Sequence, residues 1–117
     1  MTGLPSQFHL IGNALVGAEQ NHSVVSKNLA NVNTPGYKTR QIAFDKFMTR
    51  LKSGEANTKF LQAIPVEDTP NLSERADGNN VDMDQELGKL KKNSLLFQTY
   101  SHLLASKMAT ARKAISG

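Results

Sequence analysis

The sequence predicts a mainly α fold, in which long N- and C-terminal helices pair as an antiparallel coiled coil around an irregular or partly extended central arm. Apolar residues repeat every seven residues near both ends of the chain, and a polar segment containing Gly and Pro separates the two repeats. A sustained seven-residue repeat is typical of helices that pack along a shared seam. We therefore divide the 117 residues into an N-terminal helix (1–34), a turn and central arm (35–80) and a C-terminal helix (81–117), with both helices forming one domain.

The N-terminal helix is predicted from apolar positions separated alternately by three and four residues. These positions are Phe8, Ile11, Leu15, Ala18, His22, Val25, Leu29 and Val32. His22 is the polar member of the seam, and a single polar residue there can fix the register or bond to a partner. The unbroken repeat predicts that this helix needs a packing partner along its whole length.

The end of the first helix is marked by a tight turn. The segment Thr34–Tyr37 fits a type II turn, because Pro35 presets φ at the second position and Gly36 supplies a positive φ at the third. Such a turn explains why the helix stops, but it does not explain the asparagines that surround it.

Asn28, Asn31 and Asn33 precede the turn. Asn31 or Asn33 in the left-handed conformation would end the helix. Asn28, Asn31 and Thr34 also lie at helical spacing, from which their side chains could bond to a neighbour. A plain helix stop and a contact site both remain open at this point.

The central arm is predicted to begin as an extended piece that runs into one or two helical turns and ends at Ser53-Gly54. This prediction depends on a short apolar cluster, Ile42, Phe44, Phe47, Met48 and Leu51. The following residues, 53–80, are polar and contain two prolines, and only Phe60-Leu61 and the segment 64–66 are apolar enough to pack. We expect a loop or arm that is marginal on its own.

The C-terminal helix has a clear start. Gly78-Asn79-Asn80 breaks the chain, Asp82 and Gln85 form a capping-box pattern, and acidic residues occupy the first turns while basic residues lie near the end. Its seam positions are Leu87, Leu90, Ser94, Phe97, Ser101, Leu104, Met108, Ala111 and Ile115. A second apolar track consists of Leu96, Tyr100 and Leu103. The wider stripe indicates that this helix touches more than one neighbour.

Composition argues against several classes of protein. The chain has no Cys, and its histidines His9, His22 and His102 are not spaced as metal ligands. Phosphate-binding glycine motifs and nucleophile motifs are absent from the sequence, so we expect neither an enzyme nor a cofactor. The formal charge of +4 is scattered rather than clustered with aromatics, which argues against nucleic-acid binding. No apolar run approaches the roughly 20 residues of a membrane span, and we expect no membrane insertion and no cleaved signal peptide.

Two parts of the sequence resemble a known family. Asn28–Tyr37, NLANVNTPGY, is similar to the N-x-A-N-x-x-T-P-G-Y signature of bacterial flagellar rod and hook proteins. Gly78–Glu86 and Asn93–Tyr100 are similar to a proximal rod subunit in particular. The sister rod protein FlgC usually carries a P-N-V start and an S-R-x-Y-E-A-N segment here, and this chain has neither. The resemblance covers about the first 47 and the last 40 residues.

The resemblance implies a structural role rather than catalysis. In this family the two terminal helices pair in the inner tube of the rod, the arm packs outside, and the subunit joins the membrane ring and export gate to the rest of the rod and transmits torque. It further implies uncleaved export through the flagellar type III apparatus and assembly in the periplasm. The implied partners are the export apparatus, FliE, FlgC, other rod subunits and further copies of the chain.

The interaction residues that we predict come from the two seams, the second track and the turn. They are Phe8, Ile11, Leu15, His22, Val25, Asn28, Leu29, Asn31, Thr34, Pro35, Gly36, Tyr37, Leu90, Phe97, Tyr100, Leu104 and Met108. Another flagellar axial subunit such as FlgC, or a helical export chaperone or adaptor, is the alternative, because paired heptads and a basic charge suit these proteins as well.

Overall fold

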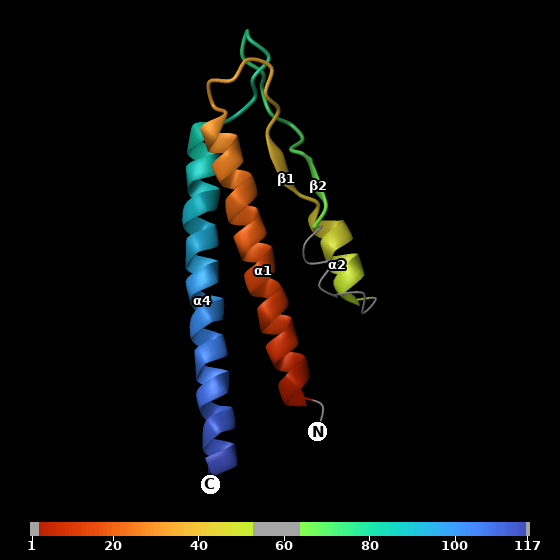
Figure 1. Ribbon diagram of the computed structural model, residues 1–117. Helices are drawn as coiled ribbons and strands as arrows, with labels where there is room; N and C mark the ends of the chain where they lie inside the picture. Colours follow the sequence, from red (N-terminus) through yellow and green to blue (C-terminus); the bar gives the residue numbers. More distant parts are fainter. Residues whose placement is uncertain (1–2, 53–63, 117) are drawn as a thin grey trace.

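The computed structural model describes residues 3–52 and 64–116 of the chain. In chain order it contains helix α1 (Gly3–Ala30), strand β1 (Arg40–Ile42), helix α2 (Phe44–Lys52), strand β2 (Val66–Asp68) and helix α4 (Met83–Ser116). Helices α1 and α4 run side by side in opposite directions, and the arm folds back along α1 (Figure 1). The result is an elongated molecule of 65 × 27 × 19 Å, and the prediction of a mainly α fold with two long terminal helices and an arm is confirmed.

Helix α1 buries the face that its heptad repeat predicts. Ile11, Ala18 and Val25 are buried, and each is seven residues from the next. The same repeat places His22 in the seam, but its side chain is exposed to solvent at one side of the contact. The apolar row therefore packs the helices together without this histidine.

Helix α4 presents a different face from the one that the heptad count predicts. Glu86 and Asn93 are buried, at 1% and 4% exposure, whereas Leu87, Ser94 and Met108 are exposed. Each buried polar residue lies one position before the apolar or small residue that we predicted. The helix is rotated because Glu86 and Asn93 both hydrogen-bond to residues of α1.

The second row of the predicted α4 seam does face α1. Leu90, Leu104 and Ala111 are half-buried, while Phe97 in the same row is 43% exposed. The second row is therefore largely half-buried, as a seam requires, whereas the first row is exposed except at Ser101, which is half-buried.

The arm is a small antiparallel sheet followed by a helix. Arg40 lies opposite Asp68 and Ile42 opposite Val66, and β2 had no counterpart in the sequence prediction. Helix α2 confirms the helical turns expected after the extended piece. The predicted stop at Ser53-Gly54 and the pair Phe60-Leu61 lie outside the described residues.

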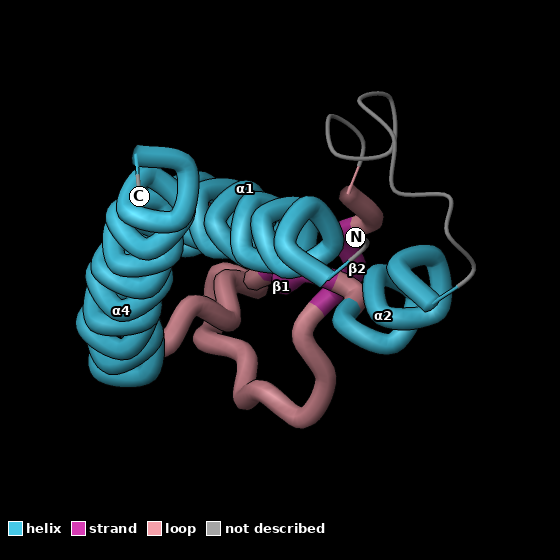
Figure 2. Tube along the Cα trace, turned by 90° about the horizontal axis from the view of Figure 1, so that it is seen from below, coloured by secondary structure: helices cyan, strands magenta, loops and turns pink. Residues whose placement is uncertain are grey.

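A small apolar core holds the arm against α1. Phe47 and Ile64 are buried, and Val16, Ile42 and Met48 pack against them. A Cβ atom at Gly17 would lie 3.4 Å from the Phe47 ring, so this glycine lets the ring approach the helix closely. Helix α1 consequently lies between α4 on one side and the arm on the other (Figure 2).

None of the described helices combines the length and the hydropathy that crossing a bilayer requires.

Candidate functional site

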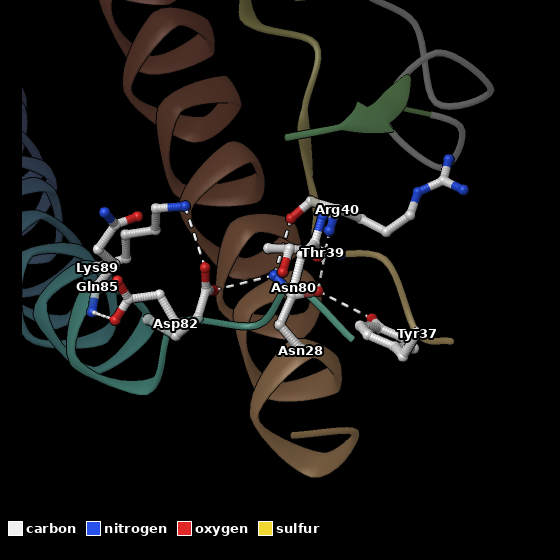
Figure 3. A network of polar contacts seen from close by, with 9 residues as sticks. Asn28, Tyr37, Thr39, Arg40, Asn80, Asp82, Gln85 and Lys89 are labelled. Atoms are coloured by element: carbon white, nitrogen blue, oxygen red, sulfur yellow. Dashed lines mark hydrogen bonds and ion pairs between the residues drawn. The ribbon is translucent and has the colours of Figure 1, made fainter. Parts of the chain in front are cut away.

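Asn28, in the last turn of α1, is the centre of a polar network at one end of the molecule (Figure 3). Its side chain is fully buried. Nδ2 donates to the Arg40 carbonyl (2.8 Å) and to Glu86 Oε2 (3.0 Å), and Oδ1 accepts from the Tyr37 hydroxyl (2.9 Å) and the Arg40 amide (3.1 Å). An amide side chain has two donors and two acceptor lone pairs, so all four are used. One residue thereby ties α1 to the turn, to β1 and to α4.

Glu86 brings a carboxylate into this buried network. Its Oε2 accepts from Asn28, and its Oε1 forms an ion pair with Lys89 Nζ at 3.1 Å. A buried charge is tolerated when it is paired and hydrogen-bonded, and Glu86 has both kinds of partner. Helix α4 is thus held to α1 by a hydrogen bond between a charged and a neutral polar group, in addition to the apolar packing of the two helices.

A second buried amide, Asn79, holds the segment that follows α1. Nδ2 donates to the carbonyls of Asn31 (2.9 Å) and Thr34 (2.8 Å), and Oδ1 accepts from the Val81 amide (2.8 Å). The side chain is fully buried. Both carbonyls lie just beyond the end of α1 and also accept a main-chain hydrogen bond within the turn, so Asn79 adds a second bond to each from 45 or more residues away in the sequence.

The turn after α1 has the form that the sequence predicts. The Tyr37 amide donates to the Thr34 carbonyl at 3.2 Å, and Gly36 has a φ of 76°. Gly36 also donates its amide to the Asp77 carbonyl at 2.9 Å. At Gly78, whose φ is 84°, an added Cβ would lie 3.4 Å from Gly36 Cα, so two glycine backbones meet where the segments cross.

Asn31 ends the helix by side-chain bonds rather than by a left-handed backbone. Its Nδ2 donates to the Lys27 carbonyl at 2.7 Å, and its Oδ1 accepts from the Thr34 hydroxyl at 3.0 Å. Among the described non-glycine residues only Asn71 has a positive φ. The prediction of a left-handed Asn31 or Asn33 was therefore wrong, because the side chain of Asn31 satisfies the helix end instead.

The start of α4 is capped and bonded to the strand segment. Asp82 Oδ1 accepts from the Gln85 amide at 3.2 Å, which confirms Asp82 as the N-cap. Just before it, Asn80 Oδ1 accepts from the Thr39 amide at 2.6 Å. We call the two segments that carry these contacts, residues 28–40 and 77–89, the polar head.

The polar head shifts the pKa of Tyr37. Burial raises the pKa of Tyr37 above its usual value; the nearby Arg40 opposes the shift and Glu86 adds to it. The hydroxyl therefore keeps the proton that it donates to Asn28.

Further down the helix pair, Asn93 makes a second polar link. Its Nδ2 donates to the Ala18 carbonyl at 2.7 Å, and its Oδ1 accepts from Asn21 Nδ2 at 3.2 Å. The contact between α1 and α4 thus contains polar bonds at two heights, one in the head and one near the middle.

Two open grooves flank this helix contact. The first, of about 730 Å³, lies between α1, the arm and α4; its lining is Leu10, Ala14, Gly17, Ala18, Asn21, Gln41, Ile42, Phe44, Phe47, Met48, Ile64, Lys92, Asn93, Leu96 and Tyr100. The second, of about 470 Å³, is lined by Ala18, Glu19, His22, Asn93, Ser94, Phe97 and Gln98. Large apolar side chains of α4 stay exposed, namely Met83, Leu87, Leu95, Leu96, Phe97, Leu103, Met108 and Ile115. Large exposed apolar side chains, where they gather into a patch, mark interaction sites.

The predicted interaction residues divide by exposure. Buried within the chain are Ile11, Val25 and Asn28. Half-buried are Phe8, Leu15, Leu29, Asn31, Tyr37, Leu90, Tyr100 and Leu104. Exposed are His22, Thr34, Pro35, Gly36, Phe97 and Met108. Their contacts with other subunits stay a prediction, and Asn79 and Glu86, which close the head, were not among them.

Comparison with known proteins identifies the family of this chain. The family described as flagella basal body rod protein matches residues 12–38, which include the second half of α1 and the turn. The chain is 33% identical to the flagellar basal body rod protein FlgB of Aeromonas hydrophila, over 80% of each chain. The chain belongs to the FlgB family of basal-body rod proteins. It is also 32% identical to FlgB of Cereibacter sphaeroides strain ATCC 17023, over 100% of this chain and 99% of the relative, and 27% identical to FlgB of Bacillus subtilis, over 90% and 89%.

Membership of the FlgB family gives the coarse function. The chain is a structural subunit of the flagellar basal-body rod rather than an enzyme, and it associates with other components of that rod. The two segments that resemble the family meet in the polar head. Asn28 and Tyr37 come from the first segment, and Asn79 and Glu86 come from the second.

Proposed function

We propose that this chain forms part of the proximal rod, where it joins the membrane ring and export gate to the rest of the rod and transmits torque. The observation that carries the proposal is the bonding of Asn28, which connects α1, the turn, β1 and α4 through one buried side chain. A part that transmits torque must not let its helices slide or its arm swing, and a satisfied buried polar network makes a structure rigid.

The three segments that we predicted then have separate tasks. Residues 1–34 and 81–117 supply the paired helices of the inner tube, and residues 35–80 supply the turn and an arm that packs outside them. The buried members of the predicted set hold the chain together, while exposed members such as His22, Phe97 and Met108 contact neighbours. The neighbours that we propose are FliE, FlgC and further copies of this chain, reached after uncleaved type III export into the periplasm.

Replacement of Leu104 by Asp tests the proposal. Leu104 is half-buried in the α4 row that faces α1, so an unpaired carboxylate there would disrupt the helix contact. We expect Leu104→Asp to abolish rod assembly and swimming in cells that depend on this subunit, while the chain is still exported. Ser106→Asp, at an exposed position of the same helix, is the matched control and should swim normally. Normal swimming by Leu104→Asp would count against the proposed role of the seam.

A further inference from the structure

The two grooves lie on opposite flanks of the helix pair at one height. Ala18 and Asn93, which are joined by a hydrogen bond, line both grooves. On α1, Gly17 lines the first groove and Glu19 the second. Successive residues of an α-helix are about 100° apart around its axis, so these two residues lie on either side of Ala18.

Helix α4 shows the same division around Asn93. Lys92 lines the first groove and Ser94 the second. The helix pair therefore has a first flank, which carries Lys92, and a second flank, which carries Glu19. Both charged residues are next in sequence to the Ala18–Asn93 link, so they lie at nearly the same height on the molecule.

These two charges have no partner within the described chain. Glu19 and Lys92 are both exposed, and neither takes part in an ion pair among the residues that the structure describes. Glu19 is also the sole acidic residue of the first 44 in the sequence, so no other carboxylate in that part of α1 competes with it. The two flanks are thus complementary in charge.

Apolar side chains accompany each charge. Beside Lys92 the first groove contains Leu96, which is 38% exposed, and the half-buried Tyr100; beside Glu19 the second groove contains Phe97, which is 43% exposed. Association that covers both grooves would remove these side chains from water and is therefore favourable.

We propose that copies of this chain pack side by side in the same orientation, with the second flank of one copy against the first flank of the next and Glu19 paired with Lys92 across the contact. This inference rests on the proposed function, in which other copies are among the neighbours. A two-fold contact through one flank would bring two Lys92 or two Glu19 side chains near each other, and like charges disfavour it. A contact between unlike flanks leaves each copy with one free flank, so it continues around a ring or a helix.

Single-cysteine variants test the contact, because the chain has no native cysteine. Leu96 lines the first groove and Gln98 the second, at nearly the same height of α4. A tagged Leu96→Cys chain and an untagged Gln98→Cys chain are produced together in a bacterium that lacks its own copy of this subunit, and isolated basal bodies are oxidised. We expect the mixed disulfide dimer to exceed either dimer of identical variants at least tenfold, because the proposed contact brings the first flank of one copy against the second flank of the next. Each chain has one cysteine, so it cannot cross-link within itself.

Charge reversal then tests the ion pair. In the cysteine background, Glu19→Lys alone or Lys92→Glu alone should lower the yield of the mixed dimer about tenfold, and both changes together should restore it. Lys91→Glu is the matched control, because Lys91 is exposed and lines neither groove, and it should leave the yield unchanged.

The outcomes separate this inference from the proposed function. Incorporation of both variants into basal bodies without a mixed disulfide, or a charge reversal that the double variant does not rescue, would overturn the side-by-side contact and leave the rod role intact. Failure of the unmodified chain to enter basal bodies would overturn the proposed function and this inference together.

Discussion

Replacing Asn28 by Ala removes the residue on which the polar head depends. The change deletes four hydrogen bonds and leaves their partners, the Tyr37 hydroxyl, both main-chain groups of Arg40 and one carboxylate oxygen of Glu86, without the amide. The new methyl group cannot replace any of these bonds. The helix end, the strand and α4 therefore lose their common attachment.

The expected loss of stability follows from the number and kind of these bonds. A buried neutral hydrogen bond contributes about 1 kcal/mol and one to a charged group about 2 kcal/mol, so three of the first kind and one of the second amount to about 5 kcal/mol. Water entering the vacated space would recover part of this, and we expect a loss of about 3–5 kcal/mol. Such a loss is a large fraction of the total stability of a small domain, which is about 5–15 kcal/mol.

Two measurements check this prediction. Urea unfolding followed by circular dichroism at 222 nm gives the free energy of unfolding, and hydrogen exchange shows whether amides of residues 37–40 and 79–86 lose protection first. Asn33→Ala is the control: Asn33 is exposed, makes no side-chain hydrogen bond recorded in the described chain, and should change stability by less than about 0.5 kcal/mol. A loss below about 1 kcal/mol for Asn28→Ala, with unchanged exchange in the head, would refute the reasoning.

Two further predictions concern the same head and helix α4. Gly78→Ala should lower stability by about 1–2 kcal/mol, because its φ of 84° is a conformation that residues with a Cβ rarely adopt. Gly88→Ala should raise stability by about 1 kcal/mol, because Gly88 lies inside α4 and a new Cβ would meet nothing within 4 Å. Urea midpoints that shift in the same direction for both variants would contradict these two expectations. The raised pKa of Tyr37 means that its contribution is fully present below pH 10, the usual pKa, and is lost as the pH rises through the higher folded-state value. The unfolding free energy of the unchanged chain should thus fall more steeply above about pH 10 than that of Tyr37→Phe, and equal slopes in pH-dependent urea titrations would count against it.

Local signals predicted much of the fold. The type II turn at Thr34–Tyr37 and the N-cap at Asp82 depend on residues within four positions of each other, and both were predicted. Strand β2 was missed for two reasons. It pairs with β1, which lies more than twenty residues earlier in the sequence, and its own three residues are all exposed. Nothing local in Val66–Asp68 indicates a strand that is held by one edge alone.

The seam of α4 shows why the site was harder to predict than the fold. Counting apolar residues favours Leu87 and Met108 as seam positions, yet the structure turns Glu86 and Asn93 inward. Their inward position depends on Asn28, Ala18 and the other α1 groups they bond to, and those are 58 and 75 residues away. A count along one helix cannot include such partners.

Bonds between groups far apart in the sequence also account for the asparagines that the turn alone does not explain. Asn28 is where the strand, the turn and α4 are joined, and Asn31 offers its side chain to the helix end and its carbonyl to Asn79. The signal available in the sequence was the co-occurrence of two amide-rich segments, around residues 28–37 and 78–86, that both matched one family. Their meeting in space could have been inferred from that pairing, although the individual bonds could not.

A seam that contains polar links specifies the position of one helix along the other more strictly than an apolar seam would. If α4 slid by one turn, about 5.4 Å, leucines could find new apolar neighbours, but Asn28, Glu86 and Asn93 would be buried without their partners, at about 1–3 kcal/mol each. The register that these residues enforce also brings Glu19 and Lys92 to one height on opposite flanks. Links that stabilise a single chain thereby determine which surfaces it presents to the next copy, so variants at Asn93 should change the pattern of cross-links as well as the stability of the helix pair.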